Sequence, residues 1–294
     1  MRLCSTMHFA DRLTEVSRAK KSVAILGLDP QLDTPAGPGI PEGYSVTSFC
    51  CELIEACERS IVAVKPQLAF FEARGLDGMR ALTEVIRFAR GRRLLTIADA
   101  KRGDIGTTSA AYAQAFLGDG DFGCDAVTVN PYLGTDTITP FFKGIRAGFG
   151  ILVLVKNSNP SSGEFQDLQA SGKPLWESIA ARVRGWGDDF IGSSGLSSIG
   201  AVVGATYPAH LKKAREQMPA AIILVPGYGT QGGSAKDAVA AARPDGSGFI
   251  VNSSRGLMYA YQKTEGENPG VAAAHAAEAM RLALNAALDS RVDR

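Results

Sequence analysis

Eight short apolar runs recur along the chain, separated by longer stretches of mixed polarity. They are rich in Val and Ile and are apolar at most positions, not only at alternate ones. This pattern is typical of strands buried on both faces, as in a parallel sheet. The eight runs are 23–28 (VAILGL), 61–65 (IVAVK), 94–99 (LLTIAD), 125–130 (DAVTVN), 151–155 (ILVLV), 199–204 (IGAVVG), 221–225 (AIILV) and 248–252 (GFIVN).

Helical periodicity fills the intervals between these runs. Within 46–60 the apolar residues recur at i, i+1, i+4, i+5 and i+8, which predicts a helix with one buried face. Ser48 is the predicted N-cap of that helix. Further patterns predict helices over 77–92, 207–218 and 234–244, and a long closing helix over 268–290.

Eight strands with intervening helices over about 250 residues match a (β/α)8 TIM barrel. An open doubly wound sheet is the alternative, but GLDP and not GxGxxG follows the first run. No shift in composition marks a domain boundary, so we expect residues 1–294 to form a single barrel domain with a C-terminal helix. The polar stretches 29–44 and 156–175 are then loops at the strand C-terminal rim, where the active sites of barrels lie.

Composition and charge disfavour several classes of function. The formal net charge is +1, so we expect neither nucleic acid nor a membrane surface as a partner. Three histidines that are far apart disfavour a histidine-rich zinc site and a Ser-His-Asp hydrolase. The chain also lacks the GxxxxGK[ST] loop of P-loop NTPases.

The cysteine pattern and the N-terminal residues bear on location. Five cysteines without a CxxC pair indicate reduced thiols and not a disulfide framework. The first residues, MRLCSTMHFADRL, lack the apolar segment of a signal peptide, and no stretch approaches a membrane span. We therefore expect a cytoplasmic protein.

Polar side chains stand where most of the predicted strands end, and a barrel would bring these ends to one mouth. If the third strand continues past 99, Asp99 and Lys101 point to the same face, with Lys65 on the neighbouring strand. Because desolvation offsets most of the attraction within a buried ion network, such a network at a barrel mouth is better explained by chemistry than by stability. The strand-end residues are Asp29, Lys65, Asp99, Lys101, Asn130, Ser158, Gln231 and Arg255.

Two late loops indicate a phosphate site. PGYGTQGG (226–233) follows the seventh strand, and its four glycines let backbone N–H groups approach an anion. NSSRG (252–256) follows the eighth strand, and Arg255 adds a bidentate donor. Barrels often bind phosphate with these two loops.

The segment ADAKRGDIGTT (98–108) resembles the active-site signature of the orotidine 5′-phosphate decarboxylase family in its longer bacterial form. Asp99, Lys101 and Asp104 match the pattern DxKxxD. Other segments similar to the family occur in order: GLDP, VKPQLAFFE, NSNPSSGEFQ, PGYGTQGG and VNSSRG. The resemblance spans 23–262. Asn157 departs from it, standing where this form of the family has Thr.

The resemblance implies a role for each matching residue. Lys65, Asp99, Lys101 and Asp104 would form an alternating catalytic array, with Asp104 and Thr108 reaching into the partner subunit of a homodimer. Asp29 and Lys65 would bind the ribose, and Ser158 the pyrimidine. The remaining substrate-binding residues implied are Pro226, Gln231 and Arg255, of which the last two would grip the 5′-phosphate.

The implied reaction is the decarboxylation of orotidine 5′-monophosphate to uridine 5′-monophosphate, without cofactor or metal. Lys101 would protonate C6, and Asp99 would face the departing carboxylate. Two alternatives remain at this point. Related barrels that act on sugar phosphates share DxKxxD and generally need Mg²⁺, and a catalytically silent nucleotide-binding barrel could act as a sensor or scaffold.

Overall fold

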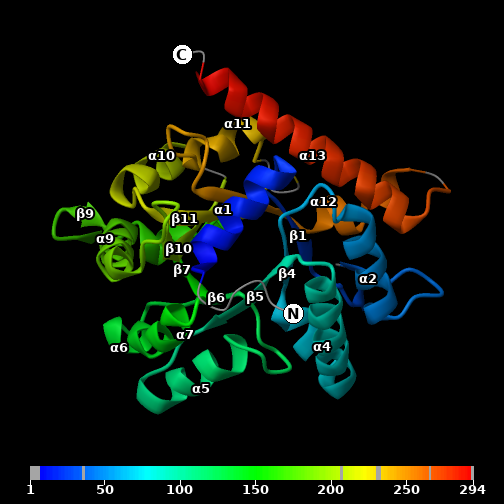
Figure 1. The fold of residues 1–294 in the computed structure, drawn as a ribbon, viewed down its shortest axis with the longest axis horizontal. Coiled ribbons are helices and arrows are strands. Elements are labelled where there is room, and N and C mark those ends of the chain that lie inside the picture. The colour runs from blue at the N-terminus through cyan, green and yellow to red at the C-terminus, as the bar shows by residue number, and fades with distance from the viewer. Residues whose placement is uncertain (1–6, 35–36, 206–207, 230–232, 265, 293–294) are drawn as a thin grey trace.

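The computed structural model describes residues 7–34, 37–205, 208–229, 233–264 and 266–292. Within these ranges, eight parallel strands close into a barrel in the order β1-β12-β11-β10-β7-β6-β5-β4 (Figure 1). Each predicted apolar run forms one of them, so the TIM-barrel prediction is confirmed. The strands are β1 (Ala24–Leu28), β4 (Ala63–Pro66), β5 (Leu95–Arg102), β6 (Ala126–Val129), β7 (Gly150–Lys156), β10 (Ser197–Val203), β11 (Ala221–Val225) and β12 (Phe249–Ser253).

Helices surround the barrel and bury their apolar faces against it. The long closing helix α13 packs on α2, α11 and α12, at one side of the molecule (Figure 1). The helices are α1 (Phe9–Lys20), α2 (Val46–Cys57), α3 (Leu68–Glu72), α4 (Gly75–Gly91), α5 (Gly106–Phe116), α6 (Thr135–Ile138), α7 (Phe142–Arg146), α8 (Gly163–Gln166), α9 (Leu175–Gly187), α10 (Pro208–Gln217), α11 (Ala235–Ala238), α12 (Arg255–Met258) and α13 (Pro269–Val292).

The expected helices are present, with corrections at their ends. The N-cap of α2 is Ser45, and the prediction of Ser48 was wrong, because Ser48 occupies the third helical position and completes a capping box with Ser45. The segment 234–244 forms only the short helix α11 and a 3₁₀ turn over Val239–Ala241. Small antiparallel hairpins lie within the two long loops: β2 (Asp33–Thr34) with β3 (Gly37–Pro38), and β8 (Gln169–Ala170) with β9 (Lys173–Pro174).

The interior of the barrel is a packed core closed at the N-terminal end by α1. Phe9, Ala10 and Leu13 of this helix join a cluster of inward-facing strand residues, separate from the core between strands and outer helices. We did not predict α1, although Phe9 and Leu13 stand at helical spacing. Because α1 fills one end, the C-terminal end is left for a site.

An ion pair joins α1 to the N-terminal end of the barrel, which is called the floor below. Arg12 Nη1 donates to Asp125 Oδ1 at 2.5 Å, and its Nη2 donates to the carbonyl of Gly148 at 3.0 Å. The other oxygen of Asp125 accepts from the backbone N–H and the hydroxyl of Thr96. Both charged side chains are largely buried, with exposures of 16% and 8%.

Replacing Arg12 by Met is expected to lower the free energy of unfolding by about 3–5 kcal/mol, because the Asp125 carboxylate would stay buried without its counter-ion. The measurement is urea unfolding followed by circular dichroism. The matched control is Arg80→Met, whose partner Asp77 and own side chain are mostly exposed; there the loss should stay below about 1 kcal/mol. Equal losses for the two variants would contradict the conclusion that the buried ion pair of Arg12 with Asp125 stabilises the fold.

Candidate active site

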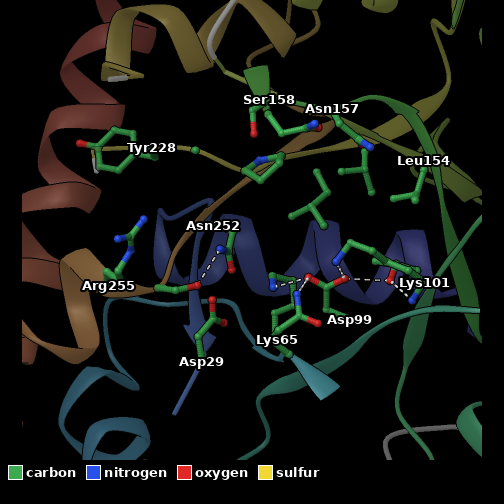
Figure 2. Close-up of a pocket in the computed structure, with 18 of the residues that line it drawn as sticks. Asp29, Lys65, Asp99, Lys101, Leu154, Asn157, Ser158, Tyr228, Asn252 and Arg255 are labelled. Carbon is green, nitrogen blue, oxygen red and sulfur yellow. Dashed lines mark hydrogen bonds and ion pairs between the residues drawn. The ribbon is translucent and has the colours of Figure 1, made fainter. Parts of the chain in front are cut away.

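A cavity of about 530 Å³ opens at the C-terminal ends of the barrel strands. Its volume lies within the range of about 300–1,000 Å³ typical of small-molecule sites. Figure 2 shows charged side chains from β4 and β5 on one side of it, and Tyr228 and Arg255 on the other. The predicted site residues among its lining are Asp29, Lys65, Asp99, Lys101, Ser158, Pro226 and Arg255.

Asp99 is the centre of the charged cluster. Its Oδ2 accepts from Lys65 Nζ at 2.7 Å and from Gln67 Nε2 at 2.9 Å. Its Oδ1 accepts from Lys101 Nζ at 2.5 Å and from Thr128 Oγ1 at 3.0 Å. Four donors therefore hold one carboxylate, and two of them are cations.

These contacts decide the ionisation of the cluster. Burial opposes the charge on Asp99, but Lys65 and Lys101 outweigh it and hold the pKa of Asp99 well below its usual value. Burial likewise opposes the charge on Lys65, yet Asp99 and Asp29 raise the pKa of Lys65. Asp99 and Lys65 thus stay ionised at neutral pH.

The backbone that carries Lys101 is irregular. Strand alternation predicts that Asp99 and Lys101 share a face, and their side chains do meet. The contact does not arise from regular strand alternation. Lys101 has a φ of 49°, in the left-handed region, and the pairing of β5 with β6 shifts register between Ala98 and Arg102. Such a φ costs a residue with a β-carbon about 1–2 kcal/mol, and strain of this kind gathers at functional sites.

The far side of the cavity is lined by the ends of β11 and β12. Pro226, Gly227 and Tyr228 follow β11, and Arg255 follows β12. Gly227 has a φ of 89°, which only glycine adopts at little cost, so the turn there requires it. Gln231, the other predicted phosphate ligand, lies outside the described residues.

Asp29 lies between the two sides of the cavity, at the end of β1. Burial raises the pKa of its carboxyl, and Lys65 opposes that effect. Within the described part of the chain, its Oδ1 is buried without a hydrogen-bond partner, as are Gln31 Oε1 and Asn252 Oδ1. All three side chains line the cavity. Unpaired buried acceptors of this kind are costly to a fold.

The loop after β7 forms the upper wall, where Figure 2 shows Asn157 and Ser158 above the charged cluster. The loop is tied to the barrel by Lys156, a buried residue whose Nζ donates to both carboxylate oxygens of Asp167 at 2.8 Å. Gln166 Oε1 accepts from the backbone N–H of Asn157 at 2.9 Å. These contacts hold the first residues of the loop over the cavity.

Three predicted residues lie away from the cavity. Asn130 is exposed and accepts from the backbone N–H of Tyr132, so its expected convergence on the mouth was wrong. Asp104 is half-buried and accepts from the backbone N–H of Ile105, and Thr108 is exposed on α5. Neither lines the cavity.

Sequence reasoning missed several lining residues. Gln67 and Phe70 follow β4 within the quoted VKPQLAFFE segment, which was a usable signal. Thr128 lies inside an apolar run, and nothing in the local pattern distinguishes it from a packing residue. The other missed residues are Gln31, Leu154, Asn159, Val202, Leu224, Tyr228, Asn252 and Ser254.

Two wider features bear on the class of site. Among the described residues, no group of three or more His, Cys, Asp and Glu side chains is placed to hold a metal ion. No helix in the described ranges is both long and apolar enough to cross a membrane.

Comparison with known proteins places this chain in a family. Residues 25–266 match the model of the Orotidine 5'-phosphate decarboxylase / HUMPS family. The chain is 44% identical over 274 residues to the orotidine 5'-phosphate decarboxylase of Rhodopirellula baltica, covering 88% of this chain and 91% of that protein. It is 43% identical over 285 residues to that of Deinococcus radiodurans, covering 96% and 99%.

A solved structure extends the likeness to three dimensions. The OMP decarboxylase of Leishmania donovani superposes with a TM-score of 0.77 at 33% identity, covering 96% of this chain and all of that one. The range matched by the family model, 25–266, includes every strand end that lines the cavity. The chain therefore belongs to the orotidine 5′-phosphate decarboxylase family.

Proposed function

We propose that Lys101 is the acid that protonates C6 of the pyrimidine during turnover. The enzyme decarboxylates orotidine 5′-monophosphate to uridine 5′-monophosphate and CO₂, a step of pyrimidine biosynthesis. The observation that carries the assignment of Lys101 is the buried carboxylate of Asp99, which holds the ammonium groups of Lys65 and Lys101 at 2.7 and 2.5 Å.

The chemistry needs a fixed cation. The bond between C6 and the carboxylate carbon breaks, CO₂ leaves, and the electron pair stays on C6, where no neighbouring group can delocalise it. An ammonium group already aimed at C6 stabilises this charge without reorganisation. Lys101 then gives its proton to C6, and its side chain, 45% exposed, can recover one from water.

The two sides of the cavity give the substrate its orientation. Arg255 and the turn at Gly227, together with Gln231, would hold the 5′-phosphate at the side opposite the charged cluster. Asp29 and Lys65 would bind the ribose hydroxyls, and Ser158 the pyrimidine. The loop after β7 would act as a lid, since binding energy at the phosphate can stabilise a closed form.

A second subunit is part of this proposal. Asp104 and Thr108 lie outside the cavity of their own chain, near the mouth, where a partner's cavity could receive them. The loops after the neighbouring strands β5 and β6 also expose apolar side chains, namely Ile105 (55%), Tyr132 (82%) and Leu133 (50%). We therefore propose a homodimer joined at these loops. We also propose a cytoplasmic location.

Catalysis should not need a divalent cation. Both oxygens of Asp99 are already occupied by four donors, and a metal ion there would compete with two ammonium groups. We expect turnover of orotidine 5′-monophosphate, followed by ultraviolet absorbance, to be unchanged within about two-fold in excess EDTA. Sugar-phosphate enzymes that use Mg²⁺ for Lewis-acid catalysis lose activity under this treatment.

The same assay separates the alternatives. Activity restored by Mg²⁺ only with a sugar phosphate would place the enzyme with the related barrels. Binding of uridine 5′-monophosphate without any turnover of orotidine 5′-monophosphate would indicate a nucleotide-binding scaffold.

A further inference from the structure

We propose that Thr128 is a positioning residue that fixes Lys101 at both its backbone and its ammonium end. The inference rests on the role of Lys101 proposed above. Thr128 lies in β6 and is buried, with 1% of its surface exposed. It lies one residue before the end of β6 and lines the cavity beside the charged cluster.

The hydroxyl of Thr128 joins two parts of the cluster. Its Oγ1 accepts from the backbone N–H of Lys101 at 2.9 Å and donates to Asp99 Oδ1 at 3.0 Å. The direction is determined, because a hydroxyl has one proton and the carboxylate can only accept. The same Oδ1 accepts from Lys101 Nζ. A closed circuit thus runs from the Lys101 backbone through Thr128 and Asp99 to the Lys101 ammonium group.

The circuit lies where regular strand pairing is interrupted. Lys101 is in the left-handed region, and the register of β5 against β6 shifts between Ala98 and Arg102. A register shift of this kind interrupts the ladder, and, as at a β-bulge, it re-aims a side chain and leaves a backbone group without its ladder partner. The hydroxyl of Thr128 takes the place of that partner for the N–H of Lys101. It thereby supports the unusual backbone that aims the side chain into the cavity.

Removing this hydroxyl should therefore act on the chemical step more than on binding. In Thr128→Val the shape is kept, the N–H of Lys101 loses its acceptor, and Asp99 loses one donor. We expect kcat to fall about 100-fold, the cost of a displacement of about 1 Å in a reacting group. KM and the affinity for uridine 5′-monophosphate should change less than about three-fold. Thr128→Ser keeps the hydroxyl and should retain kcat within about five-fold.

The chain offers a matched control at Thr96. This buried threonine on β5 also accepts from a backbone N–H and donates to a carboxylate, both belonging to Asp125 at the floor of the barrel. Thr96→Val should lower thermal stability and leave kcat unchanged. A merely structural role for Thr128 would make the two valine variants behave alike.

Each outcome bears on a separate claim. A folded Thr128→Val enzyme with wild-type kcat would overturn the inference, as would a folded Thr128→Ser enzyme that loses kcat as severely as Thr128→Val. If Thr128→Val does not fold, Thr128→Ala removes the same hydroxyl without crowding and must show the same loss of kcat. If neither variant folds, the test rests on Thr128→Ser, which must retain kcat within about five-fold. Failure of the proposed function would show differently, as turnover that survives loss of the Lys101 ammonium group.

Discussion

Replacing Lys101 by Ala is expected to lower kcat by about 10⁴-fold or more, to below ready detection. A positioned general acid contributes about 10²–10⁴-fold, and a fixed charge at the developing anion about 10²–10³-fold. Both contributions are lost when the ammonium group of Lys101 is removed. The loss should be measured in single turnovers with enzyme in excess, following the ultraviolet absorbance of orotidine 5′-monophosphate.

The variant should keep its fold and the proposed dimer. Lys65 still neutralises Asp99 after the change, so the buried carboxylate does not lose its only counter-ion. The melting temperature and the affinity for uridine 5′-monophosphate should therefore stay close to those of the native enzyme. Lys143→Ala is the matched control, because Lys143 is an exposed lysine on α7, outside the cavity. Near-native turnover by Lys101→Ala would remove Lys101 from the role of acid.

The barrel could be predicted because its strands are buried on both faces. The run 94–99 is apolar at most positions, and β5 begins at Leu95 with one face on the barrel interior and one on the helices. The convergence of Lys65 and Asp99 followed, since adjacent parallel strands end at one rim. Asn130 also follows a strand, but its side chain is exposed and accepts from the backbone N–H of Tyr132, which strand order alone does not reveal.

Other features depend on contacts that no local pattern encodes. The left-handed backbone of Lys101 arises where two strands slip in register, and its acceptor, Thr128, is far away in sequence. Ser45 and Ser48 are both acceptable caps by type, and only the backbone at the start of α2 selects Ser45. The helix α1 was missed because it serves the floor of the barrel, outside the repeating strand and helix pattern.

With the roles proposed above, substrate binding and chemistry lie on opposite sides of the cavity. Figure 2 shows Arg255 on one side and Lys101 on the other. An interaction made only at the phosphate can still accelerate the reaction at C6, provided that it orients the substrate or stabilises a closed form. The phosphate side can therefore be tested separately from the acid.

Replacing Arg255 by Ala is expected to lower kcat/KM by about two decades or more. A guanidinium group binds phosphate through two parallel N–H donors, an arrangement that a single water molecule does not reproduce. The kcat/KM of Arg255→Lys should fall between those of the native enzyme and Arg255→Ala, because lysine keeps the charge and loses the paired donors. Steady-state kinetics on both variants and the native enzyme give the ratios directly.

Orotidine, which lacks the phosphate, is the decisive control for Arg255. Native enzyme and Arg255→Ala should decarboxylate it at equal, low rates, because the contact under test is missing from both reactions. If Arg255→Ala loses as much activity toward orotidine as toward the phosphorylated substrate, Arg255 supports the cavity and not the phosphate. If it loses nothing toward either substrate, the phosphate lies elsewhere along the rim. Only a loss confined to the phosphorylated substrate shows that energy from the phosphate contact reaches the step at C6, on the opposite side of the cavity.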